Sequence, residues 1–419
     1  MRNRFWEHID WPLVVIYLAL AVFGIFNIYS AEHGEGNSIF SAGLNSGAQI
    51  KWLGASLVLA VGILFVDARF FMTFAYYFFI AVAILLVVTF LTAPEIKGAK
   101  SWLVLGGFRL GQTSEFAKFA TVLALAKFLD GFNIEIQQLK TKLIAFGIIM
   151  VPVGLVILQN DTGTAIVFLA LFLALFREGL PGWILALPVV MGAIFLAVLL
   201  LGFETMAIVL GAVVLIIAII VLLIKLPLRI IWISVGAAVV CVTFSYGVNY
   251  AFDHLKPHQK TRINVLIGLE EDPQGAGYNV RQSLITIGSG GLTGKGFLQG
   301  TQTRGSFVPE QTTDFIFCTI GEEYGLMGTT AVIVLFTILL LRIIQLAERQ
   351  KSRFARVYGY GVVAIVFCHF FLNIAMTLGL FPVIGIPLPF FSYGGSSLMG
   401  FTIMLFIFIK LDAGLKYYF

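Results

Sequence analysis

The stretch TTDFIFCTIGEE, residues 312–323, places three carboxylates at the start of a long apolar run. Asp314 lies at the edge of the run, and Glu322 and Glu323 lie inside it. On a helix, Glu322 would lie roughly 12 Å deeper than Asp314, and Glu323 would face nearly the opposite side. The three acids therefore cannot form one carboxylate dyad. We expect one functional acid at the rim, Asp314, and two acids below it that join helices together.

Two further polar stretches lie at the edges of apolar runs. GQTSEFAKFATVLALAKFL (111–129) carries Glu115 and Lys118 three positions apart, which fits either a local ion pair or a functional site in a membrane. LQNDTGTAIV (158–167) places Asp161 where capping of a helix is the favoured interpretation and a site role is the alternative. Both stretches are candidates for positioning a substrate.

Basic side chains are expected at the same end of the protein as Asp314. Fixed positive charges near a carboxylate suit a substrate with a phosphate-bearing leaving group and an alcohol nucleophile. The alternative is that outer loops simply carry solvated charges. The residues concerned are Lys97, Lys100, Arg109, Lys118, Arg281 and Lys295, with Gln282 beside them.

The glycine-rich stretch GSGGLTGKG (288–296) resembles a phosphate-binding loop only in part. The pattern G-x-x-x-x-G-K-[ST] requires glycine at Ser289 and serine or threonine at Gly296, so the pattern fails. A tight, flexible turn is the simpler interpretation. Binding of an anion by this backbone next to Lys295 is the alternative.

The composition predicts a membrane protein. Of 419 residues, 59% are hydrophobic and 12% are charged, and the mean hydropathy is +0.97. Soluble domains are about half apolar and a quarter charged, so a polytopic helical bundle is the expected fold class. The net charge of +5 gives no reason to expect nucleic acid as a partner.

The apolar runs predict an all-α bundle with about twelve membrane spans, each of about the length that a bilayer requires. Basic residues of the short loops are more numerous on the side of the N-terminus, which places both termini in the cytoplasm. The spans are expected near residues 11–30, 50–66, 70–92, 112–129, 141–158, 163–176, 182–202, 206–224, 229–249, 313–341, 357–380 and 391–410.

A long loop, residues 250–312, is expected on the outer side. It is rich in glycine, charge and amide side chains, and loops of this length are usually functional or disordered. YNVRQSLITIGSGGLTGKGFL within it mixes helical spacing of apolar residues with glycines. We therefore expect re-entrant or interfacial pieces that fold against the bundle.

Three long motifs in this chain resemble the SEDS family (shape, elongation, division and sporulation), particularly its elongation branch. The motifs are DPQGAGYNVRQSLITIGSGGLTGKGFLQGTQ, FVPEQTTDFIFCTIGEEYGLMG and PVIGIPLPFFSYGGSS, in the family's order. The resemblance covers nearly the whole chain, 1–419, as a single transmembrane domain. The family has ten spans, so residues 182–249 are expected to supply about two additional ones.

The resemblance implies a peptidoglycan glycosyltransferase that polymerises lipid II at the outer face of the bacterial cytoplasmic membrane. The family's essential aspartate falls on Asp314, and its other motifs carry over Glu115, Lys118 and Asp161. The implied partners are a class B penicillin-binding protein, which would supply cross-linking, and other membrane proteins of the elongation complex.

The expected reaction joins the 4-hydroxyl of an acceptor sugar to C1 of a donor and expels undecaprenyl pyrophosphate with inversion. Asp314 is the expected base. Lys118 and Arg109 are expected to stabilise the diphosphate, with a divalent cation (Mg or Mn) as an additional candidate. Glu115 and Asp161 would orient these groups. A lipid II flippase, a solute transporter and a non-catalytic scaffold remain alternatives.

Overall fold

The computed structural model describes residues 8–33, 38–41, 43–95, 98–105, 108–255, 260–261, 264 and 276–417. The chain forms two compact units, Met1–Leu180 with Tyr278–Phe419, and Pro181–Gly277. Each unit is described by itself.

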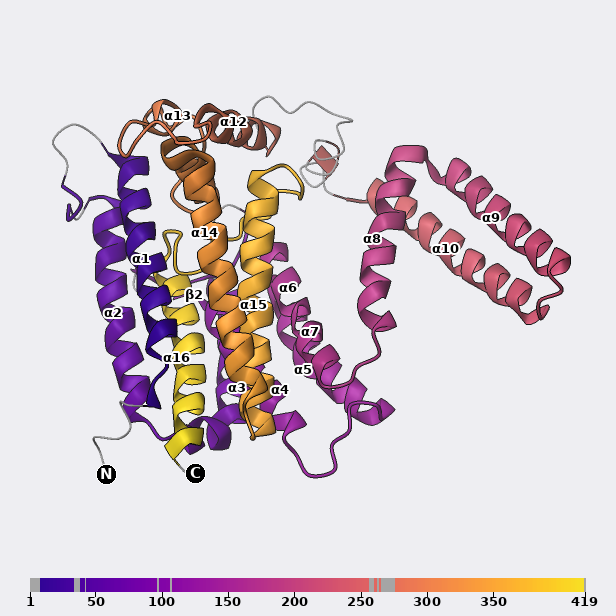
Figure 1. The fold of residues 1–419 in the computed structure, drawn as a ribbon, viewed down its shortest axis with the longest axis horizontal. Coiled ribbons are helices and arrows are strands. Elements are labelled where there is room, and N and C mark those ends of the chain that lie inside the picture. The colour runs from indigo at the N-terminus through magenta and orange to yellow at the C-terminus, as the bar shows by residue number, and fades with distance from the viewer. Residues whose placement is uncertain are drawn as a thin grey trace. The chain divides into compact units, whose positions relative to one another are not determined.

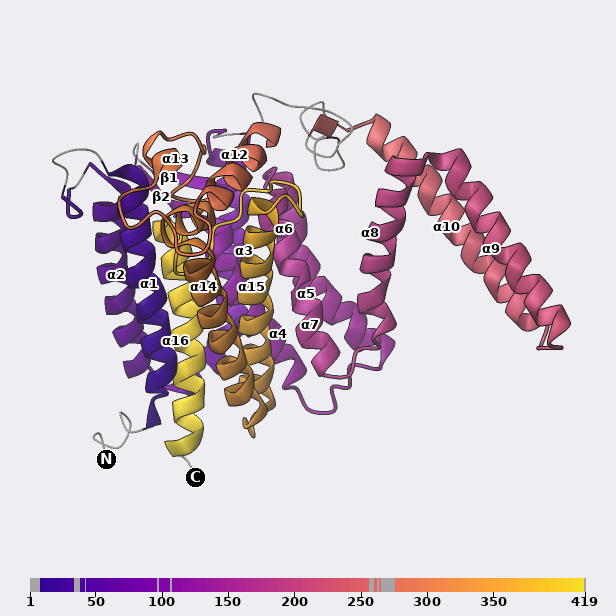
Figure 2. The same cartoon turned by 45° about the horizontal axis from the view of Figure 1, so that its top comes forward.

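The first unit is a bundle of long helices with both chain termini at one end, which we call the termini end (Figure 1). The opposite end, which we call the loop end, carries two short helices and a hairpin (Figure 2). The helices of the bundle are α1 (Trp11–Glu32), α2 (Asn45–Phe65), α3 (Ala68–Thr92), α4 (Thr113–Leu129), α5 (Leu139–Leu158), the shorter α6 (Thr162–Leu169) and α7 (Leu171–Arg177), α14 (Ile316–Glu348), α15 (Arg353–Thr377) and α16 (Gly395–Tyr417). At the loop end lie α12 (Ala276–Ser289), α13 (Thr301–Arg304), β1 (Trp102–Leu105) and β2 (Phe108–Gln112), the two strands pairing antiparallel.

The second unit consists of α8 (Trp183–Leu201), α9 (Phe203–Leu223) and α10 (Arg229–Asp253). A small apolar cluster of Ile194, Val198, Met206 and Val248 holds these helices together. Only 11% of the residues in the apolar 18-residue stretch of α8, and likewise of α9, are buried. The surfaces of these helices are therefore suited to contact with hydrocarbon chains.

The predicted all-α membrane fold is confirmed. Among the described residues, ten helices are long and apolar enough to cross a membrane. Two other predicted spans correspond to α4, which has 17 residues, and to the broken pair α6 and α7, over 162–177. The β1–β2 hairpin was not predicted, because four- and five-residue strands carry too little periodicity to be recognised.

Helices α4, α15 and α16 form the centre of the first unit. In the apolar 18-residue stretches of α16 and α15, 78% and 61% of the residues are buried, whereas the corresponding fraction for α3 is 17%. Small residues allow close approach: a Cβ on Gly361 of α15 would lie 2.4 Å from Val122 of α4. Tyr17 and Thr402 join α1 to α16 through their hydroxyl groups, at 3.0 Å. The candidate site is built on these central helices.

The glycine-rich segment 288–296 is inserted into a break in α14. Gly325 has φ +60°, and this break frees backbone groups on both of its sides. Lys295 N donates to Glu322 O and Gly296 N to Glu323 O, at 3.0 and 2.9 Å. In return, the N–H groups of residues 326 and 327 donate to the carbonyls of residues 291 and 292. The N–H groups of Lys295 and Gly296 therefore satisfy α14 rather than an anion.

Close packing at this break gives a testable difference between two glycines. A Cβ on Gly294 would lie 2.1 Å from Glu323 O, whereas a Cβ on Gly291 would meet nothing within 4 Å, and both residues have positive φ. We expect Gly294→Ala to lower the free energy of unfolding by about 1–3 kcal/mol more than Gly291→Ala does, because only Gly294→Ala adds a steric clash to the backbone strain. Thermal unfolding of the two variants in detergent measures the difference. Equal unfolding temperatures would contradict this account of the packing.

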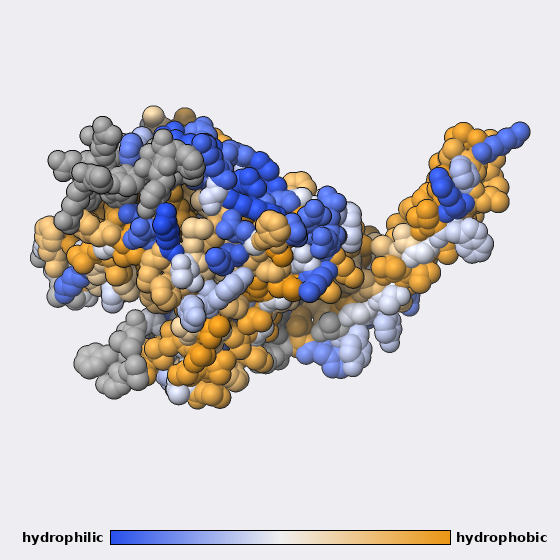
Figure 3. Space-filling model, turned by 90° about the horizontal axis from the view of Figure 1, so that it is seen from below, coloured by the Kyte–Doolittle hydropathy of each residue, from blue (hydrophilic) through white to orange (hydrophobic). Residues whose placement is uncertain are grey.

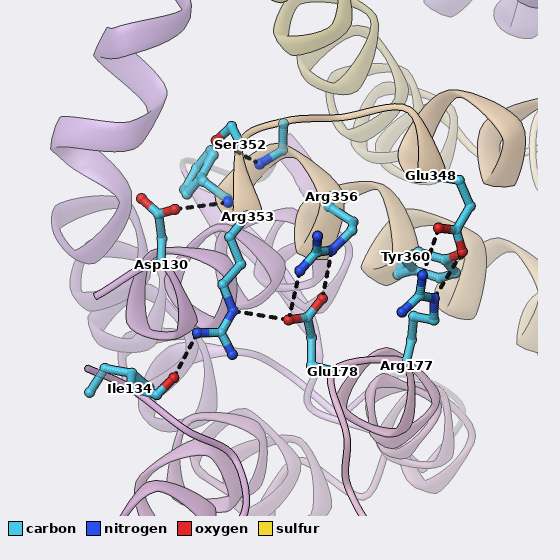
Figure 4. Close-up of polar contacts among 11 residues, drawn as sticks. Asp130, Ile134, Arg177, Glu178, Glu348, Ser352, Arg353, Arg356 and Tyr360 are labelled. Atoms are coloured by element: carbon cyan, nitrogen blue, oxygen red, sulfur yellow. Dashed lines mark hydrogen bonds and ion pairs between the residues drawn. The ribbon is translucent and has the colours of Figure 1, made fainter. Parts of the chain in front are cut away.

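Ion pairs fasten the helix ends at the termini end (Figure 4). Glu178 accepts from Nε of both Arg353 and Arg356 at 2.9 Å, and Arg177 makes a two-pronged pair with Glu348. Viewed from this end, hydrophilic residues gather in patches, whereas hydrophobic residues cover much of the remaining visible surface (Figure 3). Further pairs there are Arg342–Asp10 and Arg349–Asp412.

The pairing of Glu178 predicts a pH dependence of stability. Burial alone would raise the pKa of Glu178, but hydrogen bonds and charges of Arg356 and Arg353 outweigh it, so its pKa lies below the ordinary 4.5. A lowered pKa in the folded state means that the stabilisation is present above pH 4.5 and is lost as the pH falls further. Glu178→Gln is expected to lower the free energy of unfolding by about 1–2 kcal/mol at pH 7. It is also expected to make the decrease in stability at acid pH less steep.

Thermal unfolding from pH 7 down to pH 4 measures both effects. Glu135→Gln, which makes the same change on an exposed side chain at the same end, is the control and is expected to match the wild type. If the stability of Glu178→Gln decreased with falling pH as steeply as that of the wild type, the ion pairs of Glu178 would not contribute to the pH dependence of stability.

Candidate active site

Asp314 lies just before α14 at the loop end, with a half-buried side chain. Asn373 of α15 holds its backbone, because Nδ2 donates to Asp314 O at 2.8 Å. The carboxylate lies beside Gly385, where a Cβ would be 3.4 Å from Asp314 Oδ2. Gly385 has φ +70°, a conformation that favours glycine. The acid is thus partly accessible and is supported by a helix and by a non-helical segment.

That non-helical segment, residues 378–394, joins α15 to α16 and packs on two parts of the site. Ser392 Oγ donates to Thr313 O at 2.6 Å, and Tyr393 N donates to Thr312 O at 2.9 Å. A Cβ on Gly163 would lie 2.4 Å from Ile384 O, so α6 approaches the segment closely. Segment 378–394 therefore packs against both the Asp314 stretch and the beginning of α6.

Asp161 caps α6, as the sequence pattern favours. Its carboxylate accepts from Thr164 N at 3.1 Å and from Thr164 Oγ1 at 2.9 Å. Gln112 Nε2, at the start of α4, donates to the same carboxylate at 2.6 Å. Because Gly163 approaches Ile384 and Gly385 lies beside Asp314, both acids lie near the same short stretch of backbone.

Glu115 and Lys118 form an ion pair in the core of the bundle, with exposed fractions of only 3% and 2%. Lys118 Nζ lies 2.8 Å from each carboxylate oxygen of Glu115 and 2.8 Å from Nε2 of His369 on α15. The ammonium also lies 4.8 Å from the ring centre of Phe401. The three N–H donors of Lys118 thus face three acceptors within the protein.

His369 was not predicted. A single histidine within an apolar run is an available signal, because ionisable residues in membrane helices are costly and usually have a role. Its contact with Lys118 could not be found in the sequence, since 251 positions separate the two residues.

Glu322 and Glu323 anchor the loops to α14. Glu322, which is fully buried, accepts from Lys295 Nζ at 2.7 Å and from Thr303 N at 2.8 Å. Glu323 accepts from Ser30 Oγ of α1. These contacts agree with the expectation that the two glutamates join elements of the structure. The ammonium of Lys295 is thus paired with Glu322, an acid with a structural role.

The remaining expected basic residues are less closely tied to Asp314. Arg281 is exposed on α12, and Gln282 next to it is half-buried. Helix α12 is fixed by Ser283 Oγ, which donates to Thr377 O at 2.8 Å. Arg109 lies in β2 opposite Val104, with its side chain outside the described part of the structure, as is all of Lys97.

An open cleft of about 530 Å³ lies next to the Asp314 stretch. The end of α1, Ser306 and residues 308–312 are among the parts of the chain that line it, and they include Glu32 and Glu310. Glu32 accepts from Asn45 N at 2.7 Å and so caps α2. The cleft gives solvent a route to the residues immediately before Asp314.

The described side chains do not fit a metal ion held by the protein. No group of three or more His, Cys, Asp or Glu residues gathers among them. Both oxygens of Glu115 face Lys118, and Asp161 serves as a helix cap. Mg²⁺ commonly binds through one or two carboxylates together with substrate phosphates, which is a different arrangement from a resident site.

Together these features define a multi-pass helical membrane protein with an accessible acid at one end and a buried ion pair in its core. The chain belongs to the family of FtsW, RodA and SpoVE cell cycle proteins, whose family model matches residues 11–207 and 203–417. The resemblance to the SEDS family is therefore confirmed.

Relatives align along almost the whole chain. The peptidoglycan glycosyltransferase MrdB of Escherichia coli K12 is 34% identical over 413 residues, covering 97% of this chain and 95% of that protein. The peptidoglycan glycosyltransferase RodA of Treponema pallidum is 32% identical over 437 residues, covering 99% of both.

Solved structures share the fold. A chain in a structure described as structural coordination of polymerization and crosslinking by a peptidoglycan synthase complex is 25% identical, with a TM-score of 0.67 and coverage of 96% and 97%. The rod shape determining protein RodA of Thermus thermophilus is 25% identical, with a TM-score of 0.61 and coverage of 97% of both chains.

Proposed function

We propose that this chain is a peptidoglycan glycosyltransferase that polymerises lipid II during cell elongation. The observation that carries the proposal is the placement of Asp314 at the loop end: Asn373 holds its backbone carbonyl, and its half-buried side chain lies beside Gly385. Relatives named peptidoglycan glycosyltransferases align along the chain, which supports the same reaction class here.

Asp314 is the general base in the proposed reaction. The 4-hydroxyl oxygen of the acceptor sugar forms a bond to C1 of the donor, and its proton passes to the carboxylate. The bond between C1 and the diphosphate oxygen breaks, and undecaprenyl pyrophosphate leaves with the electron pair. Attack from the face opposite the leaving group inverts C1. A positioned base supplies about 10²- to 10⁴-fold of the rate in such reactions.

The basic residues have two different roles in the proposed reaction. Lys118 has a supporting part, because Glu115 and His369 face all of its donors in the core. Arg109, Lys97 and Arg281 are the candidates to receive the diphosphate. Gln282 and Lys295 remain candidates for substrate contact, and Asp161 positions α6 beside the acid. A divalent cation, Mg²⁺ or Mn²⁺, would have to enter with the diphosphate of the substrate.

We place the protein in the bacterial cytoplasmic membrane with both termini inside and the loop end outside. The arginines at the termini end, among them Arg177, Arg349, Arg353 and Arg356, support this orientation through the positive-inside rule. A class B penicillin-binding protein is the proposed partner, together with other membrane proteins of elongation. A structural neighbour from a complex that coordinates polymerization and crosslinking supports such a partner.

The test uses purified protein, with and without a class B penicillin-binding protein, supplied with lipid II and assayed for glycan chains. Glycan polymer is the expected result. Movement of labelled lipid II across liposome membranes without polymer would instead favour a flippase. Polymerisation by the complex that does not change in an Asp314 variant would favour a scaffold.

A further inference from the structure

Two buried polar residues lie one turn apart on α15 and face the site. His369 and Asn373 have exposed fractions of 1% and 0%. Residues four apart lie on the same face of a helix, so both side chains reach the same neighbouring segment. That segment is residues 378–394, which packs against Asp314 through Gly385.

The two ring nitrogens of His369 have different partners. Nε2 lies 2.8 Å from Lys118 Nζ, and Nδ1 lies 3.1 Å from Pro387 O. An ammonium group only donates and a carbonyl only accepts, so Nε2 must carry a lone pair and Nδ1 a proton. The ring is therefore a neutral imidazole that accepts from a cation on one side and donates to the backbone on the other.

Asn373 fastens the adjacent carbonyl. Its Nδ2 donates to Ile386 O at 2.7 Å and to Asp314 O at 2.8 Å. Helix α15 thus holds two consecutive carbonyls of the segment, those of Ile386 and Pro387. The residue before them, Gly385, is the one beside the carboxylate of Asp314.

We propose that His369 is a positioning residue of the transferase reaction. It links the buried Lys118–Glu115 pair to the backbone that supports Asp314, so that the acid is held in one orientation. The proposal rests on the proposed function, because the acid that it positions is the base assigned there. A misplacement of about 1 Å at a reacting group can cost about 100-fold in rate, so loss of this link should mainly affect kcat.

The test compares His369→Leu with His369→Gln in the full-length protein supplied with lipid II. Leucine removes both hydrogen bonds, whereas glutamine keeps an acceptor for Lys118 and a donor for Pro387. We expect the leucine variant to lose about 10- to 100-fold in kcat with little change in KM, and glutamine to restore most of the rate. Tyr358→Phe, which removes a buried hydrogen bond from α15 to Met404 O about 16 Å along the helix, is the control and should leave kcat unchanged.

A leucine variant with the kcat of the wild type would overturn the proposal, as would equal losses in leucine and glutamine. If His369→Leu does not fold, as judged by size-exclusion chromatography, His369→Phe replaces it because it keeps the ring volume. Failure of both apolar variants to fold would assign His369 to folding alone and would also overturn the proposal. Absence of polymer from the wild type would overturn the proposed function itself, which distinguishes the two failures.

Discussion

Replacing Asp314 with asparagine is expected to reduce lipid II polymerisation by about 10²- to 10⁴-fold while the protein remains folded. Asparagine has nearly the same shape as aspartate. The hydrogen bond from Asn373 Nδ2 to the backbone carbonyl of Asp314 does not depend on the charge of the side chain, and Gly385 leaves space for a side chain of this size. What is lost is the basic carboxylate oxygen that would take the proton of the acceptor hydroxyl.

The measurement is the initial rate of glycan formation by the purified variant at saturating lipid II. Asp253→Asn makes the same chemical change on an exposed side chain at the end of α10, and is expected to retain the wild-type rate. If Asp314→Asn made polymer as fast as the wild type, Asp314 would not be the base, although the chain would still belong to its family.

The second large effect is expected on stability, from Glu115→Gln. This change leaves the ammonium of Lys118 in the core without a carboxylate, and breaking a buried pair in this way typically costs about 3–5 kcal/mol. The double variant Glu115→Gln with Lys118→Met removes both charges. It should recover part of the loss, because no unpaired charge then remains buried.

Thermal unfolding of the purified variants in detergent measures these differences. Glu348→Gln is the matched control, since it breaks an ion pair with Arg177 in which both side chains are more than 40% exposed. Exposed pairs contribute about 1 kcal/mol or less, so its unfolding temperature should change little. If Glu115→Gln were no less stable than Glu348→Gln, or if the double variant were less stable than Glu115→Gln, the buried pair would not contribute to stability as proposed.

The membrane fold could be predicted because each span depends on about 20 consecutive apolar residues. The predicted spans at residues 11–30 and 70–92, for example, correspond to α1 and α3. The cap formed by Asp161 was also predictable, since its partner Thr164 is three residues away. Arrangements of this kind depend on neighbours in the chain, and the sequence shows those neighbours directly.

The glycine-rich segment 288–296 shows a contact that could not be predicted from neighbouring residues in the chain. Its composition suggested a flexible turn or an anion site, but its backbone instead fills the break in α14 at Gly325. Nothing in residues 288–296 alone indicates that contact, because the carbonyls that accept from Lys295 and Gly296 belong to α14.

The sequence by itself determined the fold class, the positions of the helices and Asp314 as the candidate base, because hydropathy, capping and family motifs are properties of short stretches. Only the tertiary structure decided what surrounds that acid. Asn373 reaches Asp314 across 59 positions, and His369 reaches Lys118 across 251. Such partners are selected by which faces of α4, α14 and α15 pack together, and that choice depends on the shapes of all the side chains between the helices.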